Sequence, residues 1–155
     1  TDVVQFGRRY EPYHQGLMHG LSGSRTKYVY ADQPGLIIYP TKTEFVLGLA
    51  DTKVSVCFPC DMTHPDRAGD VSTVTQRYFQ SFASGCVVVG RSPFELVQLF
   101  GYDPVVSADM DDPAAQIEAI LATPEKYEPL IERNLIEVSN HTTADRMQNI
   151  LRELS

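Results

Sequence analysis

Short apolar runs alternate along this chain with segments of helical periodicity, and this alternation restricts the fold more than any other feature. The apolar runs that predict strands lie at residues 3–7, 27–30, 54–58, 86–89 and 105–106. A first helical pattern follows Pro12. Three more run from Thr41 to Ala50, from Thr73 to Ser84 and from Pro93 to Gly101. Strands and helices in alternation are typical of βαβ units, so we predict an α/β domain with a parallel sheet flanked by helices.

Two local signals refine this pattern. The residues from Leu36 to Tyr39 form a short apolar run that predicts either another strand or an extended loop. Thr41-Lys42-Thr43-Glu44 has the form of a capping box, in which a threonine hydroxyl and a glutamate three residues later satisfy free backbone N–H groups. This box predicts the start of a helix.

The last third of the chain, from about residue 112 to 155, is predicted to be a helical tail. Asp112-Pro113 and Thr123-Pro124 each place a capping residue before a proline, which favours a helix start, and a third helix begins near His141. The apolar stripe of this third helix consists of Met147, Ile150, Leu151 and Leu154. We expect the tail to pack back over the sheet.

The length and charge of the chain limit its function. The 155 residues suit one domain, and the first of them is Thr, which suggests a piece of a longer or processed chain. A net charge of -7 argues against nucleic acid as a partner, because proteins that bind it present a basic face. No apolar run approaches the roughly 20 residues of a membrane span and no signal peptide is visible, so we expect a cytoplasmic protein. The three cysteines fit a reducing compartment.

The polar segment from Pro59 to Val71 is the strongest candidate for a binding site. Ligands of open α/β sheets lie at the carboxyl ends of the strands, and the segments 7–13, 59–71 and 90–93 leave such ends. Ser72, Thr73 and Thr75 sit where the next helix begins, and a helix N-terminus binds phosphate through free N–H groups. Gly69 would let the backbone approach a ligand closely. The alternative is that Thr73 and Gln76 form an ordinary capping box.

Two arginines, Arg8 and Arg9, follow the first predicted strand directly. The planar guanidinium group suits a diphosphate because it can donate to two oxygens at once. The alternative is a solvated pair without a ligand. Arg77, one turn inside the helix that follows the 59–71 segment, is interpreted either as a ligand contact or as the partner of a neighbouring carboxylate.

Three other site types are alternatives to phosphate binding. Cys57-Phe58-Pro59-Cys60 has the C-x-x-C form of a thiol redox site, but the breaker-rich residues after it predict no helix that would activate a thiolate. The histidines are scattered and predict no metal site, although His64 borders the proposed ligand site. No G-x-G-x-x-G turn or Walker lysine loop is present, which disfavours a dinucleotide-binding domain.

Several segments resemble a known group of enzymes. FQSFASGCVVV at residues 79–89 is similar to the signature in the nucleotide-sugar-binding half of GT-B glycosyltransferases. THPDRAG at 63–69 and TVTQRYF at 73–79 resemble the bacterial glycosyltransferase-like proteins related to the spore protein CgeB. Further similarity lies in FGRR at 6–9, Glu95-Leu96, LFGYDP at 99–104, and His141-Thr142 with Arg146, so the resemblance covers nearly the whole chain.

This resemblance implies a Rossmann-like lobe, one half of a GT-B fold, that binds a nucleotide-sugar. The N-terminal acceptor lobe would be missing from this sequence. No metal or other cofactor would be required, since Arg8 and Arg9 would stabilise the leaving diphosphate. The other donor contacts would come from Thr63, His64, Arg67, Gly69, Ser72, Thr73, Thr75 and Gln80.

Gln80 departs from the family pattern, which commonly has a ribose-binding glutamate at this position. An amide can still accept one hydrogen bond from a ribose hydroxyl. The departure leaves open a non-catalytic nucleotide-binding or interaction domain.

Overall fold

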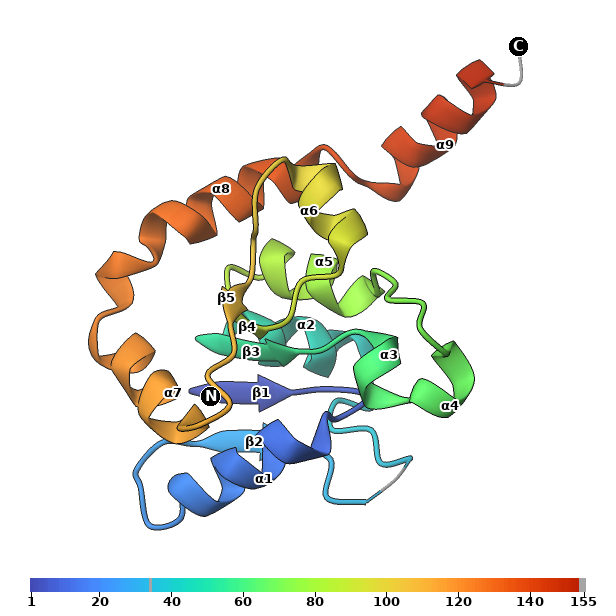
Figure 1. Ribbon diagram of the computed structural model, residues 1–155. Helices are drawn as coiled ribbons and strands as arrows, with labels where there is room; N and C mark the ends of the chain where they lie inside the picture. The colour runs from blue at the N-terminus through green and yellow to red at the C-terminus, as the bar shows by residue number, and fades with distance from the viewer. Residues whose placement is uncertain (34, 154–155) are drawn as a thin grey trace.

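The computed structural model describes residues 1–33 and 35–153 and contains one five-stranded parallel sheet in the order β2-β1-β3-β4-β5 (Figure 1). The strands are β1 (Val3–Gln5), β2 (Tyr28–Tyr30), β3 (Val54–Cys57), β4 (Val87–Gly90) and β5 (Val106–Ser107). All four strand pairs are parallel. The predicted α/β class and parallel sheet are therefore confirmed.

Helices cover both faces of the sheet. They are α1 (Glu11–Gly20), α2 (Lys42–Ala50), α3 (Cys60–Thr63), α4 (Pro65–Ala68), α5 (Gln76–Ala83), α6 (Phe94–Phe100), α7 (Pro113–Ala122), the 3-10 turn η1 (Pro124–Lys126), α8 (Glu128–Ser139) and α9 (Thr143–Glu153). Tyr13 and Leu17 of α1 and Ile117 of α7 form a core with one side of the sheet. Tyr78 and Phe82 of α5 pack with α6 on the opposite side, and Leu49 of α2 packs against β1 there.

The capping box at Thr41 forms as predicted, with Glu44 bonded back to the Thr41 backbone and α2 beginning at Lys42. The segment before it is not a strand. Residues 36–39 follow an irregular path that bends at Ile38 and Tyr39, and the Tyr39 ring lies so close to Gly48 of α2 that a Cβ on Gly48 would be 2.3 Å from it. This segment therefore covers α2 and adds no strand to the sheet.

The segment after β3 departs from the predicted loop. Residues 59–71 contain two one-turn helices, α3 and α4, joined at His64. The next helix begins at Gln76, three residues later than predicted, with Thr75 at its N-cap. The capping box of Thr73 and Gln76 does not form, so Ser72 and Thr73 lie in the connection that leads to α5.

The tail is helical as predicted, but its parts differ in packing. Helix α7 packs against α1 and α8 packs against α5. Helix α9 leads away from the body of the domain, and Met147 and Leu151 of its apolar stripe are exposed (Figure 1). The expectation that the whole tail packs over the sheet is wrong for α9. Leu154 of the predicted stripe lies outside the described residues.

Candidate functional site

The strand order places a topological switch point between β1 and β3. In sheets with the order 2-1-3-4-5, the connections after these two strands leave toward opposite faces, and ligands bind in the crevice at their carboxyl ends. Here β1 leads through Arg8 and Arg9 to α1, whereas β3 leads through α3 and α4 to α5 on the other face. The two most suggestive sequence segments therefore meet at one edge of the sheet.

Arg77 on α5 fastens these two strand ends together. Its Nη1 donates to the carbonyl oxygens of Arg8 at 2.8 Å and Phe6 at 3.5 Å, and its Nη2 donates to that of Phe58 at 3.3 Å. Gly7 leaves room for the arginine stem, because a Cβ there would lie 3.1 Å from Arg77 Cδ. Of the two interpretations of Arg77, the ion pair with a neighbouring carboxylate is not found among the described residues. The guanidinium group serves as a clamp on backbone carbonyls.

Arg8 lies on the solvent side of this clamp. Its Nη1 donates to Sγ of Cys60, the first residue of α3, at 3.3 Å. An open cavity of about 340 Å³ is lined by Arg8, Cys60, Arg67 and Thr73, together with Ala68 and Val71. Three predicted ligand contacts, Arg8, Arg67 and Thr73, are thus brought together around one hollow.

Arg9 points to the other side of β1 and is held more firmly. Its Nε pairs with Glu11 Oε1 at 3.1 Å, and its Nη1 donates to the carbonyl oxygen of Ala31 at 2.7 Å. A cavity of about 490 Å³ lies here, lined by Gly7, Arg8, Arg9, Glu11, Ala31, Gln33, Gly35, Leu36, Ile37, Thr63 and His64. Thr63 and His64 therefore join both arginines at this second hollow.

His64 connects the two one-turn helices and lies in a positive environment. Its Nδ1 is buried and has no hydrogen-bond partner among the described residues. Desolvation lowers the pKa of His64, and the positive charges of Arg8, Arg67 and Arg77 lower it further. The imidazole is therefore held neutral at physiological pH, with three guanidinium groups contributing to the local field.

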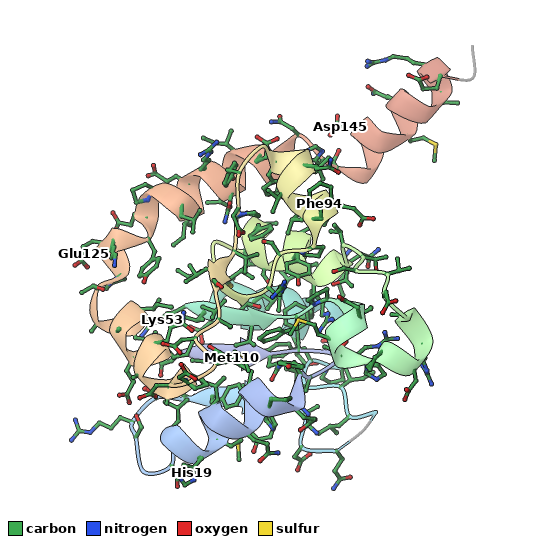
Figure 2. All side chains as sticks on the ribbon, viewed as in Figure 1. His19, Lys53, Phe94, Met110, Glu125 and Asp145 are labelled. Atoms are coloured by element: carbon green, nitrogen blue, oxygen red, sulfur yellow. The ribbon has the colours of Figure 1, made fainter. Side chains whose placement is uncertain are left out.

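The approach to α5 holds the three predicted hydroxyl residues, but they do not converge. Ser72 lines a cavity of about 470 Å³ at the ends of β4 and β5, which also includes Asp61 and the exposed ring of Phe94 (Figure 2). Thr73 faces the Arg8 cavity. Thr75 Oγ1 is buried and has no hydrogen-bond partner in the described part of the chain, and the neighbouring Val74 N–H donates to Glu95 Oε2 at 3.4 Å. A carboxylate thus already lies near this helix start.

Gly69 and Gln80 line neither of the cavities around Arg8 and Arg9. Gly69 has a φ of +56°, a turn conformation that favours glycine, and a Cβ built there would meet no atom of the described residues within 4 Å. Its predicted close approach to a ligand stays a prediction. Gln80 is half-buried on α5 and lines none of the cavities around Arg8, Arg9 or Ser72. Its predicted ribose contact stays a prediction.

The structure disfavours the thiol redox alternative. Cys57 lies in β3 and is buried, and burial raises the pKa of its thiol. A reactive thiol needs the opposite environment, with exposure and a lowered pKa. Among the described residues no group of three or more His, Cys, Asp or Glu side chains is placed to hold a metal ion, and His19 lies on the outer surface of α1 (Figure 2). Within residues 1–33 and 35–153, no helix is long and apolar enough to cross a bilayer.

Two features of the site could not be read from sequence patterns. One is Gly90 at the end of β4, where a Cβ would lie 1.8 Å from the Cys57 carbonyl oxygen, so no side chain fits. The other is the pair of buried His14 and partly buried Tyr28 behind Arg9, joined at 2.8 Å. For Gly90, the sequence offers one indirect signal, which is a glycine at the end of a valine-rich strand. His14 offered no local signal.

Comparison with known proteins agrees with this architecture. A family model described as glycosyl transferase-like matches residues 41–152, which is more than half of the chain. Searches of curated proteins and of solved structures gave no significant match. The matched region includes the segment from His64 to Gly90 and both one-turn helices. On the strength of this match, the chain belongs to the glycosyl transferase-like family.

Proposed function

We propose that this domain is the donor-binding lobe of a glycosyltransferase and holds the diphosphate of a nucleotide-sugar at the β1/β3 switch point. Family membership supports a role in glycosyl transfer. The identity of this chain as the donor side, and the location of the diphosphate, are inferences from the site. The acceptor and the general base would belong to a second lobe of the same enzyme.

The observation that carries this proposal is the concentration of positive charge at one edge of an acidic chain. Arg8, Arg9, Arg67 and Arg77 gather around His64 and two cavities, although the net charge is -7. The exposed guanidinium group of Arg8 has donors left for a ligand, since only Nη1 is bonded within residues 1–33 and 35–153. Such a group forms strong, charge-assisted hydrogen bonds to phosphate.

The chemistry follows from this placement. When the bond between the anomeric carbon and the diphosphate breaks, negative charge grows on the leaving phosphate oxygens. Fixed guanidinium groups beside those oxygens stabilise the charge without a metal ion. Arg8 and Arg67 are placed to contact the diphosphate directly, while Arg77 fixes the backbone that carries Arg8.

Isothermal titration calorimetry with a panel of nucleoside diphosphates, their sugars and the matching nucleosides tests the proposal. We expect at least one diphosphate to bind in EDTA, and to bind more tightly than its nucleoside. Arg8→Ala should weaken the diphosphate and leave the nucleoside nearly unchanged. Folded protein that binds none of these compounds would refute the proposal, and an equal effect of Arg8→Ala on both would refute the assigned role of Arg8.

Cys60 provides an independent readout. Cys57 and Cys86 are buried, whereas Cys60 is partly exposed and bonded to Arg8. Alkylation by iodoacetamide should therefore occur at Cys60 in the folded protein, and a bound diphosphate should slow it. Cys60→Ser serves as the control that loses the labelling and retains binding.

A second candidate is a lobe that binds nucleotide without transferring a sugar. Gln80 supports it, because this residue stands where the resembled family commonly has a ribose-binding glutamate. The two candidates differ in one measurement on the full enzyme. Slow hydrolysis of the bound nucleotide-sugar supports catalysis, whereas tight binding without any turnover supports the second candidate.

A further inference from the structure

A chain of hydrogen bonds runs from the ligand edge into the core behind Arg9. Arg9 Nη1 lies 3.4 Å from His14 Nε2, and His14 Nδ1 lies 2.8 Å from the Tyr28 hydroxyl. The Tyr28 hydroxyl in turn donates to Gln5 Oε1 at 2.7 Å. His14 and Gln5 are 3% and 1% exposed, whereas Arg9 and Tyr28 are partly buried.

The direction of this chain fixes the proton on the imidazole. A guanidinium group can only donate, so His14 Nε2 must accept from Arg9 and carry no proton. The Tyr28 hydroxyl donates its proton to Gln5 Oε1, so the Tyr28 oxygen can only accept from His14 Nδ1–H. Every bond then runs the same way, and His14 is the neutral tautomer with its proton on Nδ1.

We propose that His14 is a positioning residue for anion binding, whose neutral Nδ1–H tautomer holds the Arg9 guanidinium group in a fixed plane for the ligand phosphate. This inference rests on the proposed function of the site. Glu11 accepts a hydrogen bond from Nε of Arg9, while Ala31 and His14 accept from Nη1. Within residues 1–33 and 35–153 nothing accepts from Nη2, so that group is available to a ligand in the 490 Å³ cavity that Arg9 lines.

The surroundings of His14 agree with a neutral ring. The charged and titratable groups that face it are Arg9 from the β1–α1 connection, Glu11 at the start of α1, and Tyr28 and Tyr30 from β2. Desolvation lowers the pKa of His14 and the positive charge of Arg9 lowers it further, against a smaller opposing effect of Glu11. A proton on Nε2 would face the guanidinium group directly and break the contact.

Two substitutions separate this role from simple packing. His14→Gln can place a carbonyl oxygen near the position of Nε2 and so can still accept from Arg9. His14→Asn is shorter and reaches only the position of Nδ1. With inorganic pyrophosphate as the probe, we expect His14→Asn to bind roughly fivefold to tenfold more weakly than wild type, and His14→Gln to stay within about twofold.

A double-mutant cycle and a spectroscopic measurement complete the test. In an Arg9→Met background, His14→Asn should cause no further loss of affinity, because the residue acts through Arg9. Nitrogen-15 shifts of the His14 ring should show Nδ1 protonated and Nε2 unprotonated at pH 7.5. The opposite tautomer, or wild-type affinity in His14→Asn, overturns the inference while the proposed function stands. A folded wild-type protein that binds neither pyrophosphate nor any nucleoside diphosphate overturns both.

Discussion

Replacing Arg77 tests whether its hydrogen bonds hold the ends of β1 and β3 together and stabilise the domain. Arg77→Met keeps much of the aliphatic stem over Gly7 and removes the guanidinium group that donates to the carbonyl oxygens of Arg8 and Phe58. The contact to Phe6 is 3.5 Å long and adds little. Hydrogen bonds to a charged group contribute about 1.5–3 kcal/mol each when buried. The Arg8 carbonyl is exposed and can be rehydrated, so we expect a total loss of about 2–4 kcal/mol.

Thermal and urea unfolding measure this loss. For a chain of this length each kcal/mol lowers Tm by roughly 2–4 °C, so the expected decrease is roughly 5–15 °C. Arg77→Lys should fall between wild type and Arg77→Met, because one ammonium group cannot reproduce the planar fork. Arg25→Met, which removes an exposed arginine from the α1–β2 connection, is the matched control and should lie within about 0.5 kcal/mol of wild type.

The same variant should also weaken pyrophosphate binding, because the released backbone carries Arg8. Arg8→Met provides the comparison, with weaker binding but a stability within about 0.5 kcal/mol of wild type. If Arg77→Met were as stable as the Arg25→Met control, the carbonyl clamp would not contribute to the fold. If Arg77→Met lost stability but bound pyrophosphate normally, the clamp would not position the site.

Three further variants probe other parts of the domain. Gly90→Ala places a Cβ 1.8 Å from a carbonyl oxygen of β3 and should cost more than about 4 kcal/mol, whereas Gly101→Ala, at φ +72° in open space, should cost about 1–2 kcal/mol. Thr41→Ala removes the capping box and should cost about 1 kcal/mol in urea unfolding, with Thr43→Ala as the near-neutral control. The folded-state pKa of His14 is lowered, so the unfolded chain takes up the proton first and stability should fall as the pH drops below about 6.5, less steeply in His14→Gln.

Each of these expectations has an opposing result. Equal unfolding free energies for Gly90→Ala and Gly101→Ala would show that the β3 and β4 ends can separate freely. A Thr41→Ala variant as stable as Thr43→Ala would show that the start of α2 is held by tertiary packing alone. Identical pH profiles for wild type and His14→Gln would show that the imidazole titrates normally.

The elements that could be predicted are those whose causes are local. The valine-rich segments 54–57 and 87–89 give buried strands, and the capping box at Thr41 needs only residues within one turn. The boundaries of α5 depended on tertiary context. Thr73 and Gln76 have the capping pattern, yet the helix starts later, at Gln76. The N–H of Val74, just before this start, donates to Glu95 of another helix.

The segment from 59 to 71 shows a different limit. Each of its helices, α3 and α4, is one turn long and has few internal hydrogen bonds, so the sequence carries almost no periodic signal for it. Its polar, breaker-rich composition correctly indicated a connection at the carboxyl end of β3. The composition could not show that His64 joins two helical turns and turns its Nδ1 inward.

The arginines show why the sequence could point to candidate ligand contacts but could not assign their individual roles. All four near the edge carry the same charge, and sequence cannot rank them. Their roles are set by acceptors far along the chain: Arg77 is bonded to carbonyls 19 and 69 residues away, and Arg9 to one 22 residues away. A guanidinium group that is already bonded to a carbonyl oxygen still attracts a diphosphate through its charge, but it has fewer N–H groups left to donate to the ligand. It follows that Arg8 and Arg67 should dominate direct contact with the ligand, while Arg77 should influence affinity through the position of Arg8.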